Sequence, residues 1–188
     1  MTKKTDYQRS KLYRVERIWW EKYKDQKVDV CNRPTNFDTT AQAQSYACNV
    51  WRYYKNKIYP RSWRKDTTLR IKETRGRSSW AMNTGGWYTN KNGVDYVKIK
   101  LSGWHHSAKI VLHEVAHHLA PEGAHHDGRF VKVYMFLLAK DLGYSISYMC
   151  KVANEHNLDF HSEDVFLNTW FNKIIQKEIE EEAKKLSA

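Results

Sequence analysis

Apolar residues recur at helical spacing through much of the chain, which predicts a mainly helical protein. The expected helices cover residues 6–20, 39–54, 107–120, 130–142, 145–157 and 162–179. Thr39 and Gln42 have the spacing of a capping box at the start of the second helix. Gly143 is the expected end of the fourth helix, because glycine readily adopts the left-handed conformation that stops a helix.

Alternating apolar and polar residues predict a small sheet between the second and third helices. Segment 94–101 is the clearest strand, because Lys98 and Lys100 alternate with three aliphatic residues. Shorter strands are expected at 69–72 and 80–84, and an Asn-Gly pair before the main strand predicts a hairpin turn. The two lysines are typical of an edge strand, which either protects a sheet or pairs with an extended peptide.

The composition favours one globular domain without a membrane span. The chain has 188 residues, of which 41% are hydrophobic, enough for one sizeable core. No run of about 18 apolar residues occurs, and the first 17 residues contain no apolar signal-peptide core, so a cytoplasmic protein is expected. Three widely spaced cysteines without a CxxC pair favour buried, reduced thiols over disulfides or a zinc ribbon.

The net charge of +11 is concentrated in one segment, residues 52–77. This segment contains ten lysines and arginines against two acids, and four aromatic residues stand among them: Tyr53, Tyr54, Tyr59 and Trp63. Cations that neutralise phosphates and rings that stack on bases predict contact with nucleic acid. The alternative is a solvated basic surface without a partner.

The sequence His113-Glu114-Val115-Ala116-His117 is an HExxH motif within the third expected helix. Histidines at i and i+4 lie one turn apart on the same side, where both imidazoles can bind one Zn²⁺ with the glutamate beside the open position. On a helical wheel the two histidines and Glu114 lie opposite an apolar arc formed by Val111, Leu112, Val115, Ala116 and Leu119. The motif therefore predicts a zinc site on a polar face of this helix.

Several residues after the motif compete to be the third zinc ligand: Glu122, His125, His126 and Asp127. The metzincin pattern is excluded, because Ala120 and Gly123 stand where it requires glycine and histidine. His126 is the favoured ligand, since it precedes the helix that Phe130 opens, and His125 is its rival. Glu155 is the weaker choice that a gluzincin pattern would require. His118 points about 100° away from His117 and is expected to pack.

The motif and its flanks resemble a metallohydrolase family of actinobacteria and their phages. That family is zincin-like and similar to the SprT-like metalloproteases, which carry HExxH and a later His-Gly-x-x-Phe. The resemblance is strong at 111–131 and looser over residues 6 to about 157, including Asp6-x-Gln8-Arg9-x-x-x-Tyr13-x-x-Glu16. One departure is Asp127, which stands where the family usually has glycine.

The resemblance implies a Zn²⁺ ion held by His113, His117 and His126, with Glu114 as the general base. It also implies an α+β, zincin-like fold, in which a small, mainly antiparallel sheet packs on the metal helix with additional helices. A single domain over residues 1–188 is expected, with 162–188 as a C-terminal helical extension.

The favoured function is a zinc metallopeptidase that acts on a peptide or protein substrate. Two alternatives stay open: a zinc amidohydrolase of a non-protein substrate, and a nucleic-acid-binding protein in which zinc is structural. A structural site would have four protein ligands, which His125 and His126 together could complete. Asp127 is the residue expected to orient a ligand histidine. The oxyanion partner is left open among Tyr134, His125 and Arg129.

Overall fold

The computed structural model describes residues 6–64, 66–74, 80–82, 88–102 and 107–186. The helices are α1 (Arg9–Lys22), α2 (Thr40–Tyr54), α3 (Ala108–Leu119), α4 (Gly128–Leu142), α5 (Ile146–Glu155) and α6 (Val165–Leu186), with a short 3₁₀ turn at Ser62–Arg64. The strands are β1 (Thr68–Thr74), β2 (Trp80–Met82), β3 (Tyr88–Thr89) and β4 (Asp95–Ser102). Each predicted helix is therefore present, although α1 begins three residues later and α6 continues beyond residue 179.

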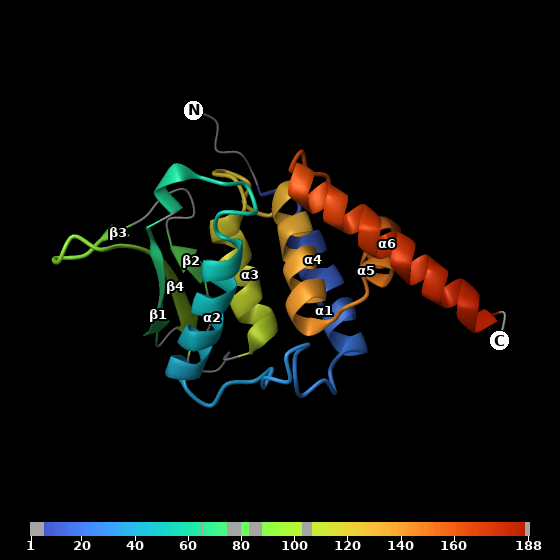
Figure 1. The fold of residues 1–188 in the computed structure, drawn as a ribbon, viewed down its shortest axis with the longest axis horizontal. Coiled ribbons are helices and arrows are strands. Elements are labelled where there is room, and N and C mark those ends of the chain that lie inside the picture. Colours follow the sequence, from blue (N-terminus) through green and yellow to red (C-terminus); the bar gives the residue numbers. More distant parts are fainter. Residues whose placement is uncertain (1–5, 65, 75–79, 83–87, 103–106, 187–188) are drawn as a thin grey trace.

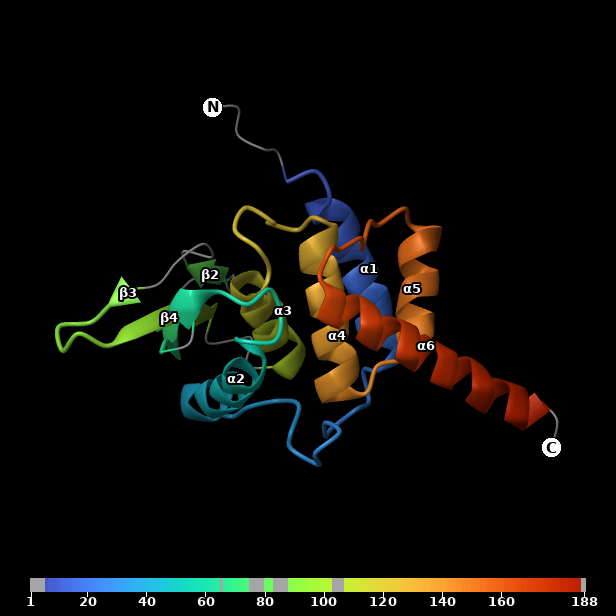
Figure 2. The ribbon, with the colours of Figure 1, turned by 45° about the horizontal axis from the view of Figure 1, so that its top comes forward.

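Helix α3 lies at the centre of the molecule, between a sheet and a group of helices (Figure 1). On one side it contacts α2, β2 and β4, and α2 also packs against β1. On the other side α3 packs on α4, which in turn contacts α5 and α6 (Figure 2). A helix in this position is covered on most of its circumference, so polar side chains that it carries are buried.

The sheet is mixed, and β4 is its central strand. The strand order is β1-β4-β2, and β3 also pairs with β4. The longest pairing, β1 with β4, is parallel, whereas β2 and β3 pair with β4 in the antiparallel direction. The expectation that segment 94–101 is an edge strand was wrong, because parallel pairing with the distant β1 was not visible in the local pattern. The α+β class is confirmed.

Local sequence signals account for several helix ends. Thr39 and Gln42 form the predicted capping box at the start of α2. Gly143 ends α4 with a φ of 74°, as its left-handed role requires. Ser107 occupies the N-cap of α3, but its side chain makes no capping hydrogen bond. The Asn-Gly turn joins β3 and β4, with Gly93 at a φ of 75°.

The C-terminal helix α6 packs into the same core as the rest of the chain. Leu167 and Phe171 are buried, and Phe136 of α4 contacts both Phe166 and Trp170. Towards its C-terminal end α6 extends away from the other helices (Figure 1). Within the described residues, no helix is both long and apolar enough to cross a membrane. The three cysteines are free thiols, but the expected burial was wrong: Cys31 is exposed, and Cys48 and Cys150 are half-buried.

Candidate metal centre

Helix α3 presents His113, Glu114 and His117 to the interior of the protein. His113 is 8% exposed and Glu114 is 5% exposed, so the polar side of the helical wheel is not a solvent face. Phe130 and Tyr134 of α4 pack against the His113 ring, with ring centroids 5.0 and 5.2 Å away. Buried histidines and carboxylates are costly unless they have polar partners or bind a metal, so their partners decide what this site is.

The loop between α3 and α4 brings His126 back over α3. Asp127 caps α4 by accepting hydrogen bonds from the backbone of Arg129 and Phe130, which fixes the end of the loop. The buried Gln8 side chain donates to the His126 carbonyl and accepts from the Asp159 backbone, so it ties the loop to a distant segment. Gly128 allows close packing here, because a Cβ atom would lie 2.7 Å from the His161 backbone nitrogen.

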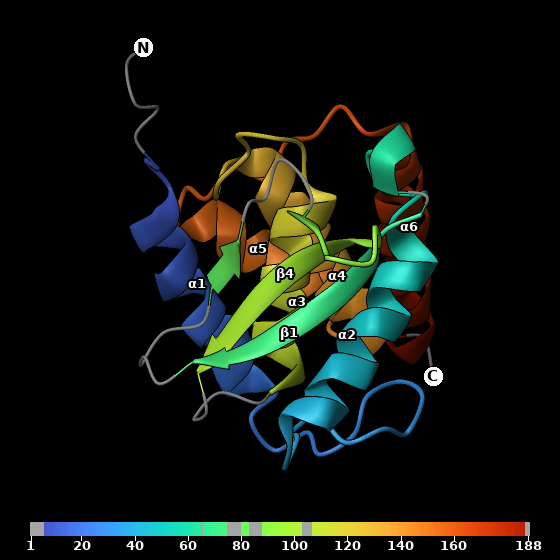
Figure 3. The same ribbon diagram turned by 90° about the vertical axis from the view of Figure 1, so that its left-hand side faces the viewer.

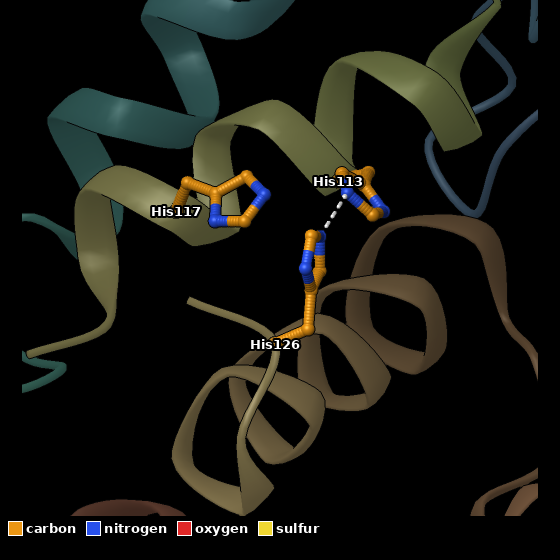
Figure 4. A group of neighbouring side chains, drawn as sticks. All are labelled: His113, His117 and His126. Carbon is orange, nitrogen blue, oxygen red and sulfur yellow. Dashed lines mark hydrogen bonds between the residues drawn. The ribbon is translucent and has the colours of Figure 1, made fainter. Parts of the chain in front are cut away.

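The three histidines form a compact cluster, in which one ligand nitrogen from each ring lies within 4.8 Å of the other two (Figure 4). The Nε2 atoms of His113 and His126 are 3.3 Å apart. The rings of His117 and His126 are also close, with centroids 4.7 Å apart. Two ligands from one helix turn and one from the following loop therefore converge on a single point, as the sequence predicted.

Two carboxylates contact the histidine rings on the side that faces away from the centre of the cluster. Glu16 Oε1 lies 2.6 Å from His113 Nδ1, and Asp6 Oδ2 lies 2.5 Å from His126 Nδ1. Since an ionised carboxylate can only accept, each imidazole donates from Nδ1 and turns Nε2 towards the other ring. Metal-binding histidines are commonly oriented in this way by a carboxylate behind the ring.

These orienting residues differ from the one expected, Asp127. Its side chain caps α4 and pairs with Arg129, so it does not support a ligand histidine. The sequence does contain a signal that Glu16 is buried, because Glu16 follows Leu12 and Val15 at helical spacing on the buried side of α1. A carboxylate at a core position needs a buried partner, and here the partner is His113.

The spacing of His113 and His126 fits a tetrahedral zinc ion. Zinc–nitrogen bonds of about 2.0–2.1 Å in tetrahedral geometry place two ligand nitrogens about 3.3–3.4 Å apart. The His113 and His126 Nε2 atoms are 3.3 Å apart, which matches this spacing and also allows a hydrogen bond when one of the two rings carries a proton on Nε2. When neither Nε2 carries a proton, the two lone pairs repel each other unless a cation lies between them, so the neutral cluster is suited to a metal ion.

Comparison with known proteins does not assign a family or a function to this site. No protein-family model, curated protein or solved structure matches the chain. The zincin-like fold and the family resemblance therefore stay predictions, and the roles of the residues follow from their positions.

Two of the three histidines, His117 and His126, are biased towards the neutral form that binds metal. Burial lowers the pKa of His117 well below its ordinary value, and the neighbouring His113 and His126 lower it further. Burial also lowers the pKa of His126, more than the hydrogen bond to Asp6 raises it. At His113 burial acts in the same direction, but the Glu16 carboxylate outweighs it and raises the pKa. Metal binding requires neutral imidazoles, and at least two of the three are held in that state.

Tyr13 and Arg9 of α1 lie beside the cluster. The Tyr13 ring is 5.6 Å from the His126 ring and 6.1 Å from the His113 ring, measured between centroids. Arg9 Nε donates a hydrogen bond to the Tyr13 hydroxyl over 3.2 Å. Burial raises the pKa of Tyr13, the Arg9 contact opposes this, and the charges of Glu16 and Glu114 add to it. The phenol is therefore a neutral hydrogen-bond donor close to the Glu114 carboxylate.

The remaining candidates from the sequence lie outside the cluster. Glu122, His125 and Glu155 are exposed, and none of them belongs to the group of possible metal ligands among the described residues. His118 is fully buried, as expected for a packing residue, and its Nε2 lies 3.0 Å from the Lys98 carbonyl oxygen. Of the two rival histidines, His126 is the one that lies in the cluster.

Proposed function

We propose that this protein is a zinc-dependent metallopeptidase. The observation that carries the proposal is the three-histidine cluster on and beside α3, with two imidazoles oriented by Glu16 and Asp6. Three protein ligands are typical of catalytic zinc, which keeps its fourth position for water, whereas structural zinc usually has four. When bound, zinc would supply a Lewis acid and lower the pKa of a coordinated water to near 7.

Glu114 is the residue placed to move the proton. It follows His113 directly in α3, and its charge acts on both His113 and Tyr13. In the proposed reaction the Glu114 carboxylate accepts a proton from the attacking water and then delivers it to the leaving amine. Its low exposure keeps bulk water away from the carboxylate during both transfers.

Tyr13 is the best-placed donor for the oxyanion of the tetrahedral intermediate. Tyr134 is already occupied, because its hydroxyl donates to the Lys109 carbonyl and accepts from Trp20 Nε1. Arg129 is paired with Asp127. His125 is exposed and lies outside the cluster. Accepting the Arg9 N–H polarises the Tyr13 hydroxyl and strengthens it as a donor.

A structural zinc site is less consistent with these positions. It would require a fourth protein ligand, and the described residues that converge here are three histidines. A non-protein amide as substrate involves the same residues and the same reaction, so an experiment must separate it from a peptide.

The first test is the zinc content of tag-free protein by elemental analysis, with His125→Ala as the matched control. About one zinc per chain is expected in the wild type and in His125→Ala, and a loss in His113→Ala and His126→Ala. Retention of zinc without His126, or no zinc in the wild type after reconstitution, would overturn the ligand set.

The second test is hydrolysis of fluorescein-labelled casein and of small acyl amides by the zinc-loaded protein. Glu114→Gln should keep zinc but lose turnover at least 100-fold, the lower range for a general base. Tyr13→Phe should lower kcat by about 100-fold with little change in KM, as for removal of one oxyanion donor. Cleavage of amides without casein would move the assignment to the amidohydrolase, and full activity in Glu114→Gln would remove the base.

A further inference from the structure

The basic segment 52–77 does not form one continuous surface in the folded protein. Arg64 is buried, and its guanidinium donates to the carbonyl oxygens of Ile58, Tyr59 and Ala120. Tyr54 belongs to the core, and the Tyr59 hydroxyl is bonded to Ser162. Two of the aromatic residues that suggested base stacking are therefore engaged inside the protein.

A different basic surface appears on the outer face of the sheet. Helices α2 and α3 pack on the inner face, and none of the described helices covers the outer face (Figure 3). Because Val97, Ile99 and Leu101 are fully buried, the alternate residues of β4 point outward. The pairing of β1 with β4 then places two pairs of cations side by side on this face: Arg70 with Lys98, and Lys72 with Lys100.

Cations at directly opposite positions of β1 and β4 make this face electropositive. Like charges directly opposite each other on neighbouring strands destabilise a sheet. Arg70 and Lys72 are exposed, and Lys98 and Lys100 are half-buried. None of the described outward positions of β1 and β4 carries a carboxylate. The face is therefore complementary to a polyanion.

Two tyrosines complete this face. Tyr88 of β3 pairs with Tyr96 of β4, and their rings stack with centroids 5.7 Å apart and an angle of 27°. The Arg70 guanidinium lies over the Tyr96 ring at 4.9 Å, and Lys98 Nζ lies over the Tyr88 ring at 4.8 Å. Cation–π contacts of this kind hold the charged groups next to the rings. The result is a pair of neighbouring rings, each with a cation over it.

We propose that this outer face, formed by Arg70, Lys72, Tyr88, Tyr96, Lys98 and Lys100, binds single-stranded nucleic acid. The cations would neutralise phosphates, and the two tyrosine rings would stack on unpaired bases. Sheet faces with aromatic residues bind single strands in this manner, because the bases of a duplex are already stacked on one another. An acidic peptide matches the charges but makes no use of the rings, so it is the less complete partner.

This surface is separated from the metal centre by α3. The sheet lies on one side of α3 and α4 on the other, so the proposed binding does not depend on the proposed hydrolase activity (Figure 1). Binding is therefore expected to be the same in zinc-loaded protein and in His113→Ala. The two proposals can fail separately.

The test is fluorescence anisotropy of a 5′-fluorescein-labelled dT20 strand titrated with the full chain at several salt concentrations. If all four cations contact phosphates, the slope of log K against log salt is about −3, since each phosphate contributes about −0.7. The double variant Lys98→Ala/Lys100→Ala should reduce the slope to about half of that value. Its matched control is Lys151→Ala/Lys173→Ala, which removes the same charge from exposed positions on α5 and α6.

The aromatic contribution is tested by Tyr96→Leu against Tyr96→Phe. Loss of one stacked base should weaken binding roughly 5- to 150-fold in Tyr96→Leu, whereas Tyr96→Phe keeps the ring and should stay near the wild type. Tyr88→Leu repeats the measurement at the edge of the sheet if Tyr96→Leu loses its fold by circular dichroism. Equal weakening by the control pair, no effect of either leucine variant, or equal affinity for a duplex or for polyglutamate would overturn the proposal.

Discussion

Removal of the charge behind His113 should weaken zinc binding strongly. Glu16→Gln keeps the size of the side chain and its ability to accept from His113 Nδ1, but it removes the negative charge. The Glu16 carboxylate is 3% exposed, so solvent screens it little. The carboxylate lies on the far side of the imidazole, roughly 6 Å from the point where the three ligand nitrogens converge. At this distance a unit charge and a divalent ion attract each other by about 5 kcal/mol at an effective dielectric constant of about 20.

Part of that attraction is offset because the ionised carboxylate is itself costly to bury. Substitution of such orienting carboxylates commonly lowers metal affinity by about 10- to 100-fold. Glu16→Gln is expected near the upper end of this range. Asp6→Asn is expected near the lower end, because the Asp6 side chain is 27% exposed and its charge is better screened.

The assay is a competition titration of zinc against a chromophoric chelator at pH 7.5, for wild type, Glu16→Gln and Asp6→Asn. Glu21→Gln is the control, since Glu21 lies on the same helix but pairs with Lys24 at the surface. Circular dichroism shows whether each variant keeps its helices. Unchanged zinc affinity in both test variants, or an equal loss in Glu21→Gln, would refute the role given to these carboxylates.

Three further predictions concern stability. Gly128→Ala should destabilise the protein by about 3 kcal/mol, because the new Cβ would lie 2.7 Å from both Asp159 Oδ2 and the His161 nitrogen. In urea unfolding Gly93→Ala, which meets nothing within 4 Å, should cost only the roughly 1 kcal/mol of its positive φ, and equal costs would contradict this. Burial raises the pKa of Asp141 to about 7 against the attraction of Arg33, so its contribution to stability is complete below about pH 4 and is lost as the pH rises to about 7. Asp141→Asn should remove that decline in thermal unfolding and exceed the wild type at pH 8; an unchanged decline would exclude Asp141 as its source. Burial raises the pKa of Glu178, but hydrogen bonds from Ser147, Ile146 and Ser145 at the start of α5 outweigh it and lower the pKa. Its contribution is therefore present above about pH 4.3 and is lost at lower pH. Glu178→Gln should cost about 1–2 kcal/mol at pH 7 and little at pH 3, compared by urea unfolding with Glu180→Gln, and a cost that does not change with pH would contradict the assignment.

Periodicity and end signals were sufficient to predict the helices. The apolar spacing of α4 and the capping residues of α2 depend on neighbours within about one turn, so they are visible in the sequence. The central position of β4 in the sheet depends instead on its parallel pairing with β1, which lies more than 20 residues earlier in the sequence. Local alternation shows which residues share a face of a strand, but not which strands pair with it. The pairing of β4 with β1 could therefore not be predicted, and the strand was wrongly expected at the edge of the sheet.

The candidate metal ligands lie close together in the sequence, whereas the residues that support them do not. His113 and His117 are one helical turn apart, and His126 follows in a short loop, so the cluster is local in sequence. The carboxylates come from about 100 residues earlier, with Glu16 and Asp6 reaching His113 and His126 across the core. Asp127 was nearer in sequence, but the start of α4 uses its side chain.

The charges around the cluster give an independent reason to expect a divalent cation. In their ionised forms the surrounding carboxylates are Asp6, Glu16 and Glu114, and the nearby cation is Arg9, which leaves a net charge of −2. Since most of this charge is buried, it is costly unless a counter-charge lies within the cluster. A Zn²⁺ ion between three neutral imidazoles would balance it, and Arg9→Ala would restore an excess of one negative charge. Tighter zinc binding in Arg9→Ala by chelator competition is therefore expected, and weaker binding would show that Arg9 supports the site through Tyr13 instead.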